Sequence, residues 1–199
     1  MTVARGISPP NLPVAPTEYQ VRYQDQFSNV LRLFFSQVAN RVNSPTAHAS
    51  YFDTTTQPNP VADAVNLFTY NSVVSELGVT RGTPTSKIFV AQTGIYNFQF
   101  SAQLDKAGGS ASAVYIWPRI NGVNVPNSAT KVVIDGPNNE IVPAWNFVLV
   151  LQANDYFELA WQSSDTDVVI SAEAAAGNIP GVPSIILTVV WVSNYEANE

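Results

Sequence analysis

Residues 94–100 read Gly-Ile-Tyr-Asn-Phe-Gln-Phe, and the alternation within this stretch decides the fold class. Successive side chains of a β-strand point to opposite faces, so Tyr96 and Phe98 share one face and the neighbouring amides share the other. Residues 157–162 alternate in the same way. Both stretches therefore predict strands with one face in a core and one face in water.

Similar short runs recur on both sides of these stretches, from residue 47 onward. Turn signals rich in Gly, Asn and Asp separate them, and Asn121-Gly122 is typical of a two-residue hairpin. Strands of this number and spacing predict a mainly β chain folded as an antiparallel sandwich or barrel. The predicted strands are residues 50–55, 65–70, 87–91, 94–104, 113–120, 130–134, 144–151, 156–162, 168–173 and 184–192.

The N-terminal part follows different patterns. Four prolines within residues 1–16 predict an extended, polyproline-like arm. From Thr17, an expected N-cap, apolar residues recur at steps of three and four, which predicts an amphipathic helix over residues 17–43, about 40 Å long. The predicted domains are therefore an arm over residues 1–16, a helical segment over 17–45 and a β domain over 46–199.

The chain is poor in residues for chemistry near neutral pH. Only 12% of its 199 residues are charged, it has one His, and it has no Cys. The missing Cys excludes disulfides and thiolate nucleophiles, and it fits synthesis in a reducing cytoplasm. No apolar run reaches the length of a membrane span, and the N-terminus lacks the apolar core of a cleaved leader. We therefore expect no membrane insertion.

Charge is divided unevenly along the chain. Residues 1–45 hold four Arg against two acidic residues, and the remainder holds five basic against thirteen acidic residues. The total of −6 argues against direct binding of nucleic acid. A basic N-terminal piece on an acidic body predicts two surfaces with different partners.

Three groups of residues are candidate sites. A catalytic triad needs Ser, His and Asp, and these residue types occur together at Ser50, His48 and Asp53. They lie too close in sequence, however, and the glycines of a nucleophile elbow are missing. The acidic clusters at 165–167 and 138–140 are compatible with calcium, although solvated loops explain them better. We predict no catalytic residue, no metal site and no cofactor.

The aromatic residues allow two interpretations. Tyr115, Trp117 and Trp145 are of the type that forms a platform for sugars, and Pro118 suggests a strand edge or bulge that would expose a ring. Packing in the core is the interpretation we favour for all four Trp, including Trp161 and Trp191.

The last predicted strand, residues 185–192, is almost continuously apolar, which is typical of a strand buried on both faces. A single sandwich covers one face only. The second face would then need a neighbouring subunit, or the helix of the same chain.

Residues 47–192 resemble the jelly roll shared by tumour necrosis factor (TNF) and the globular head of the complement collagen-like proteins. The resemblance lies in Gly-x-Tyr-x-Phe at 94–98, Arg-Ile-Asn-Gly at 119–122, and the strand–turn–strand of residues 147–159. It implies a homotrimer whose inner sheet faces pack around a threefold axis, with the closing strand 184–192 at that axis. The chain lacks the collagen stalk, Cys and signal peptide that would suit a secreted cytokine.

The N-terminal piece is similar to a leader on small structural proteins of marine and cyanobacterial tailed phages. The similarity lies in residues 5–13, Tyr19 and residues 31–35. It implies a non-enzymatic virion protein, made in the host cytoplasm and placed on the capsid surface. We expect a trimeric cement or decoration protein that anchors to the major capsid protein.

Two alternatives stay open: a head or tail fibre knob that recognises a host receptor or glycan, and a hydrolase that uses His48. The expected anchoring residues are Arg5, Ile7, Leu12, Val14, Tyr19, Arg22, Tyr23, Phe27, Leu31, Phe34 and Phe35. The expected trimer-interface residues are Tyr96, Phe98, Phe157, Leu159, Leu187, Val189 and Trp191.

Overall fold

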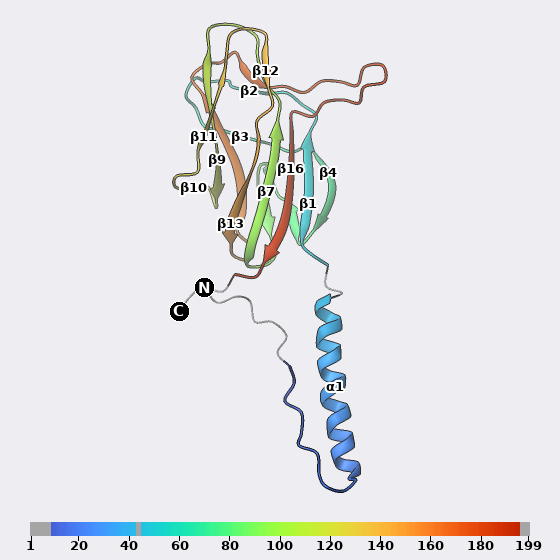
Figure 1. Ribbon diagram of the computed structural model, residues 1–199. Helices are drawn as coiled ribbons and strands as arrows, with labels where there is room; N and C mark the ends of the chain where they lie inside the picture. The colour runs from blue at the N-terminus through green and yellow to red at the C-terminus, as the bar shows by residue number, and fades with distance from the viewer. Residues whose placement is uncertain (1–8, 43–44, 196–199) are drawn as a thin grey trace. The chain divides into compact units, whose positions relative to one another are not determined.

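The computed structural model of the chain describes residues 9–42 and 45–195 (Figure 1). The chain divides into two compact units. One comprises Met1–Thr46 with Glu196–Glu199, and the other, the body, comprises Ala47–Tyr195.

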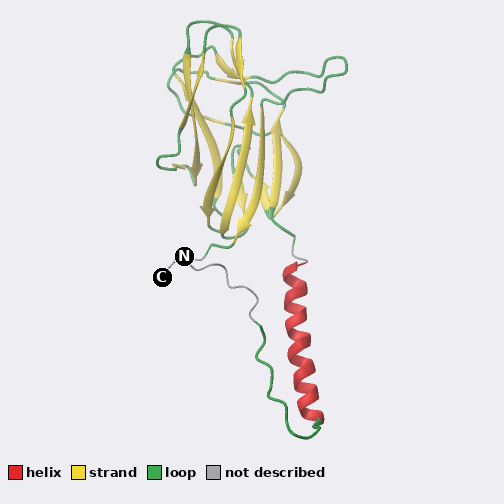
Figure 2. Cartoon of the chain, in the orientation of Figure 1, coloured by secondary structure: helices red, strands yellow, loops and turns green. Residues whose placement is uncertain are grey.

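The N-terminal unit holds an arm without regular structure and one helix, α1 (Val21–Val42), drawn in red in Figure 2. The predicted N-cap at Thr17 is wrong by about one turn, because Thr17 lies in a bend and the Gln24 amide donates to the Gln20 carbonyl at 3.2 Å. A Thr near a helix start serves a turn as well as a cap, so the signal did not fix the first helical residue.

The body is built from antiparallel sheets. A five-stranded sheet has the order β13 (Ala144–Leu151), β7 (Gly94–Ala102), β16 (Ile185–Ser193), β1 (His48–Asp53) and β4 (Ser72–Leu77). A seven-stranded sheet has the order β10 (Val123–Asn124), β9 (Ser112–Ile120), β14 (Tyr156–Ser163), β6 (Ile88–Val90) and β5 (Val79–Arg81). In that sheet β11 (Thr130–Ile134) also pairs with β9, and β3 (Asn66–Leu67) with β14.

A smaller sheet of four strands closes one end of the body (Figure 1). Its order is β12 (Asn139–Ile141), β8 (Leu104–Lys106), β15 (Val168–Ile170) and β2 (Gln57–Pro58). The stretch predicted as one strand over 94–104 breaks at Gln103, between β7 and β8. The Gln103 amide donates to the Ser184 carbonyl, and its carbonyl accepts from the Ser171 amide, so the break connects three segments.

The core lies between the five- and seven-stranded sheets and is rich in aromatic rings. Phe98 of β7 stacks on Phe157 of β14, with ring centroids 4.0 Å apart and planes 11° apart. Phe68 packs against both Phe100 and Trp161. The Phe98–Phe157 and Phe68–Phe100 contacts join inward-facing residues of opposite sheets, whereas Phe68 and Trp161 are neighbours within the seven-stranded sheet.

The predicted hairpin at Asn121-Gly122 is confirmed. Val123 pairs with Ile120 across the turn, and φ is 51° at Asn121 and 77° at Gly122. Positive φ at both central positions is the geometry of a tight turn that matches strand twist, and Asn and Gly adopt it at least cost.

Within the body, β16 is covered on one face only, as expected of this strand in a single sandwich. Its side chains alternate, with Leu187 and Val189 in the core and Ile186, Val190 and Val192 exposed. In the body, therefore, the second face of β16 is an exposed apolar surface.

Candidate interaction surfaces

The outward face of the five-stranded sheet is a broad surface with little charge. Strand register aligns its residues in three rows of five, which run from β13 to β4. The first row is Val148, Asn97, Val190, His48 and Leu77, the second is Asn146, Gln99, Thr188, Ser50 and Ser75, and the third is Ala144, Ser101, Ile186, Phe52 and Ser72. We call these fifteen residues the sheet face.

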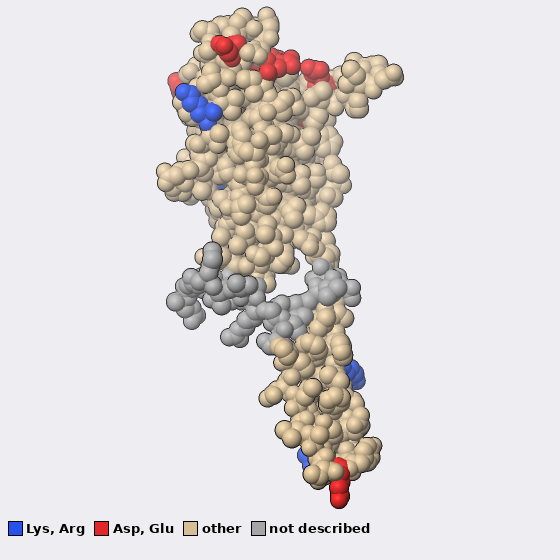
Figure 3. Space-filling view, in the orientation of Figure 1, with Lys and Arg blue, Asp and Glu red and all other residues tan. Residues whose placement is uncertain are grey.

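The sheet face contains no Asp, Glu, Lys or Arg. Figure 3 shows this side of the body, where acidic side chains gather only toward the end that bears β12. Val148, Val190, Ile186 and Leu77 expose their side chains among amides and hydroxyls. Exposed apolar side chains surrounded by uncharged polar groups are typical of the centre of a protein–protein interface.

Six of the predicted trimer-interface residues belong to the core of a single chain: Tyr96, Phe98, Phe157, Leu159, Leu187 and Val189 are all enclosed by their own sandwich. Side chains so enclosed have no surface to offer a second copy, so the prediction is corrected for these six. The seventh, Trp191, is only partly buried and packs against the same core. Alternate residues of β7 and β16, which carry five of the seven, do contribute to the sheet face, whereas Phe157 and Leu159 lie on β14 of the seven-stranded sheet.

A hairpin beside the sheet face extends away from the sandwich (upper right in Figure 1). Its arms pair at Glu173 with Val182 and at Ala176 with Ile179. The intervening residues are all exposed, and Ile179 is the large apolar side chain among them. Pro183 and Gly181 at its base line a cavity of about 540 Å³ together with Phe52 and Ile186 of the sheet face.

The predicted anchoring residues lie on the arm and on α1. Leu12, Val14 and Tyr19 of the arm are exposed, as is Arg22. Along α1 the half-buried residues Tyr23, Phe27, Leu31 and Phe34 form one apolar stripe, and Phe35 beside them is 61% exposed. Tyr23 stacks on Phe27, with ring centroids 6.1 Å apart. Arg5 and Ile7 lie outside the described residues.

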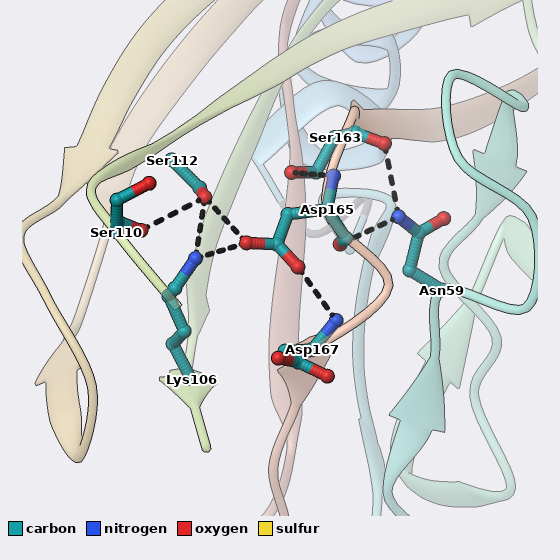
Figure 4. A network of polar contacts seen from close by, with 7 residues as sticks. All are labelled: Asn59, Lys106, Ser110, Ser112, Ser163, Asp165 and Asp167. Carbon is teal, nitrogen blue, oxygen red and sulfur yellow. Dashed lines mark hydrogen bonds and ion pairs between the residues drawn. The ribbon is translucent and has the colours of Figure 1, made fainter. Parts of the chain in front are cut away.

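A buried ion pair connects three segments of the body (Figure 4). The ammonium of Lys106, at the end of β8, is fully buried and pairs with the Asp165 carboxylate and the Ser112 hydroxyl. The Ser112 hydroxyl also donates to Asp165 at 2.7 Å, and the Asp167 amide donates to the other carboxylate oxygen at 2.9 Å. Hydrogen bonds to Lys106, the Asp167 amide and Ser112 lower the pKa of Asp165 to about 2.

This network occupies the carboxylate of Asp165 in the first of the two acidic clusters that are compatible with calcium. The Asp165 oxygen nearest Asp167 accepts a backbone amide, and the other is bound to the Lys106 ammonium. In the second cluster, Asn139 donates to the Asp135 carbonyl at 2.7 Å. In the part of the chain that the structure describes, no group of three or more His, Cys, Asp or Glu is arranged as metal ligands.

The structure separates the three residues of the imagined triad. His48 and Ser50 lie on the outward face of β1, whereas Asp53 is buried on the inward face. The Asp53 carboxylate accepts from the Thr55 amide at 2.9 Å and from the Thr69 hydroxyl at 3.2 Å. These three side chains therefore do not form a catalytic triad.

The candidate sugar platform divides between the two sheets. Trp145 of β13 packs edge-on against Phe100, with ring centroids 4.7 Å apart, and Trp161 is fully buried. Tyr115 and Trp117 lie two residues apart on β9, on the outward face of the seven-stranded sheet, where they line a cavity of about 720 Å³.

Sequence reasoning missed the Lys106–Asp165 pair. The two residues are 59 positions apart, and only the placement of β8 beside the loop after β14 brings them together. The one available signal was a lysine at the end of an apolar strand.

Among the described residues, no helix combines the length and hydropathy that crossing a bilayer requires.

No family model matches the sequence, and neither does any curated protein. Solved structures with a similar fold include Eiger TNF from S. frugiperda, with a TM-score of 0.46 and 11% identity, covering 78% of this chain and 98% of that one. Murine APRIL at pH 8.5 has a TM-score of 0.48 and 11% identity, covering 74% of this chain and 100% of that one.

The predicted fold class is confirmed. The chain is mainly β, with an antiparallel jelly-roll sandwich that follows the arm and one long helix in the sequence.

Proposed function

We propose that this chain is a non-enzymatic structural protein of a virion: a homotrimer that decorates the capsid surface and anchors to the major capsid protein through its arm and helix. It is made in the host cytoplasm and stabilises the head by joining neighbouring capsid subunits. The observation that carries the structural role is the pairing of an uncharged sheet face with a separate, apolar and basic N-terminal unit.

The sheet face supports self-association. Exposed Val, Ile and Leu lose contact with water in an interface, and no charge has to be desolvated with them. The expectation of three copies comes from the resemblance to TNF. A second copy of this chain is the simplest partner, because an uncharged face is not repelled electrostatically by the same face of another subunit in a symmetric ring.

The N-terminal unit supports attachment to a different partner. An extended proline-rich arm loses little entropy when it is ordered along another surface. Arg22 and Arg32 are exposed on the face of α1 away from its apolar stripe, so the stripe is the part of the helix that we expect to contact that surface. Residues 1–45 carry net positive charge and the body net negative charge, so the two parts suit different surfaces.

The test is the number of copies in purified particles, measured by quantitative mass spectrometry against the major capsid protein. A cement protein is expected at roughly one copy per capsid subunit, as a closed symmetric layer requires. Absence of the chain from particles would overturn the virion role altogether.

The second candidate is a fibre knob that recognises the host surface, and the aromatic cavity on β9 favours it. A knob would use the same anchor and the same trimer but would occur in only a few copies per hundred capsid subunits, roughly as expected for fibres placed at vertices. The copy number therefore separates the two candidates.

A further inference from the structure

The cavity of about 720 Å³ on the seven-stranded sheet is built around two aromatic side chains of β9. Trp117 lies beneath the segment that follows β10, and its indole N–H donates to the Asn124 side-chain oxygen at 2.8 Å. Tyr115 stands beside it and is 42% exposed. The cavity is thus open to solvent at Tyr115 and closed at Trp117.

Amides and a hydroxyl surround the rings. Asn124 ends β10, Asn127 and Ser128 come from the segment between β10 and β11, and Gln162 comes from β14, directly opposite Tyr115. Gln162 donates to the Asp63 carbonyl at 2.8 Å, which holds its side chain in place. Among the described residues, none forms a hydrogen bond with the Tyr115 hydroxyl or with the side-chain amide of Asn127, so both groups can bind a ligand.

Asn127 is fixed by its backbone. Its φ is 57°, in the left-handed region that Asn tolerates better than most residues. The Ser128 hydroxyl donates to the Val125 carbonyl at 2.7 Å and closes the same turn. The amide is thus presented from a turn with a defined conformation, which lowers the entropy lost on binding.

The chemistry of the lining selects the ligand class. No Asp, Glu, Lys or Arg lines the cavity, so a phosphate or a carboxylate would find no counter-charge in its lining. The Lys131 ammonium already lies over the Tyr115 ring, 5.9 Å from its centroid, and disfavours a second cation there. A purely apolar ligand would leave the amides without partners. A sugar ring offers C–H faces to an aromatic plane and hydroxyls to planar amides, and it satisfies both kinds of group.

We propose that this cavity binds a neutral saccharide, with Tyr115 as the stacking platform and Asn127 and Gln162 as hydrogen-bonding partners of its hydroxyls. The site lies on the outward face of the seven-stranded sheet. It is therefore on the opposite side of the sandwich from the sheet face and stays open in the proposed trimer. Saccharide binding does not depend on the proposed capsid role.

The test uses the full chain and a panel of neutral hexasaccharides: maltohexaose, cellohexaose, mannohexaose and chitohexaose. Each is titrated to about 10 mM, which detects affinities of a few kcal/mol, while the indole N–H resonance of Trp117 is followed by NMR. We expect at least one probe to shift that resonance in a saturable way, because Trp117 forms the closed end of the cavity. If no probe shifts it, the proposal is overturned.

Two variants locate the binding. Tyr115→Ala removes the platform, and Asn127→Gly removes the amide while keeping the positive φ. Each should weaken binding of the active probe by about tenfold, the usual effect of losing a central aromatic or hydrogen-bonding contact.

Tyr195→Ala is the matched control, because Tyr195 is 43% exposed and lies outside the cavity. Binding to this variant should equal that of the natural chain. Equal weakening in Tyr115→Ala and Tyr195→Ala, or no weakening in Tyr115→Ala, would assign the binding to another surface and overturn the proposal.

Discussion

At the scale of single residues, the most demanding feature is the buried ammonium of Lys106. A buried charge is tolerated only when it is paired and hydrogen-bonded. Here the Asp165 carboxylate pairs with the ammonium, and the Ser112 hydroxyl accepts a hydrogen bond from it. Asp165 is in turn held by the Asp167 amide and by Ser112. The pair ties β8 to the loop between β14 and β15, at the end of the body that the four-stranded sheet closes.

Removing only the Asp165 carboxylate should therefore lower the free energy of unfolding more than removing both members of the Lys106–Asp165 pair. Asp165→Asn leaves the buried ammonium without a counter-charge, and we expect it to lower the free energy of unfolding by about 3 kcal/mol. Adding Lys106→Met, which replaces the ammonium by an apolar side chain of similar length, should restore most of that loss. Urea unfolding of the two variants and the natural chain measures both values. A double variant no more stable than Asp165→Asn would contradict this account.

The same pair predicts a pH dependence. The pKa of Asp165 is lowered from 3.8 to about 2, mainly by the hydrogen bond from Lys106. A carboxyl with a lowered pKa in the folded state stabilises the fold above its unfolded pKa, and this contribution is lost as pH falls from about 4 to about 2. The difference in unfolding free energy between the natural chain and Asp165→Asn should shrink across that window. Urea unfolding at several pH values measures it, and a constant difference would contradict the assignment.

At the scale of elements, α1 combines an apolar stripe with a face of Ser, Gln and Asn. A helix of 22 residues with this composition owes its stability to packing of the stripe rather than to its own propensity. Tyr23, Phe27 and Phe34 on the stripe are large aromatic side chains, the type that dominates binding energy in interfaces.

The proposed anchor predicts that charge on the stripe abolishes attachment. Phe34→Glu places a carboxylate in the apolar contact, whereas Ser36→Glu adds the same charge about 200° around the helix and serves as the control. Particles lacking the protein are mixed with each variant, sedimented and assayed for the bound chain. We expect Ser36→Glu to bind like the natural chain and Phe34→Glu to remain in the supernatant. Equal binding of both variants would remove the stripe of α1 from the anchor.

The elements predicted from sequence were those with strict alternation or turn chemistry. Residues 94–100 and the Asn121-Gly122 turn behave as expected because their signals are local. Residues 72–77, which form β4, were missed because their apolar residues Val73 and Val74 are adjacent. The register shift of the β1–β4 pair between Ser50 and Tyr51 accounts for the broken alternation.

The surfaces were harder to predict than the strands. Alternation separates two faces of a strand but does not say which one the chain itself covers, so Tyr96 and Leu187 were assigned to a trimer when they form the core. The cavity at Tyr115 depends on how the turn at Asn127 packs near Trp117. No local sequence pattern predicts that packing.

At the scale of the whole molecule, charge and hydrophobicity are distributed by surface. The sheet face is uncharged, although the chain has a net charge of −6. Net negative charge of this size favours solubility and works against non-specific association. A charge-free face within such a molecule confines close contact between copies to that one side, which also leaves the outward face of the seven-stranded sheet open.

The proposed trimer therefore predicts different effects for one substitution on the two sheets. Val190→Glu places a carboxylate in the middle of the first row of the sheet face, where Val190 is 39% exposed, and each interface would have to bury an unpaired charge, at about 3 kcal/mol or more. Val133→Glu makes the same change on β11 of the other sheet, where Val133 is 49% exposed. Sedimentation velocity should give a trimer for the natural chain and for Val133→Glu, and a monomer of unchanged circular dichroism for Val190→Glu. A natural chain that sediments as a monomer would refute self-association, and a trimeric Val190→Glu would move the contact away from the sheet face.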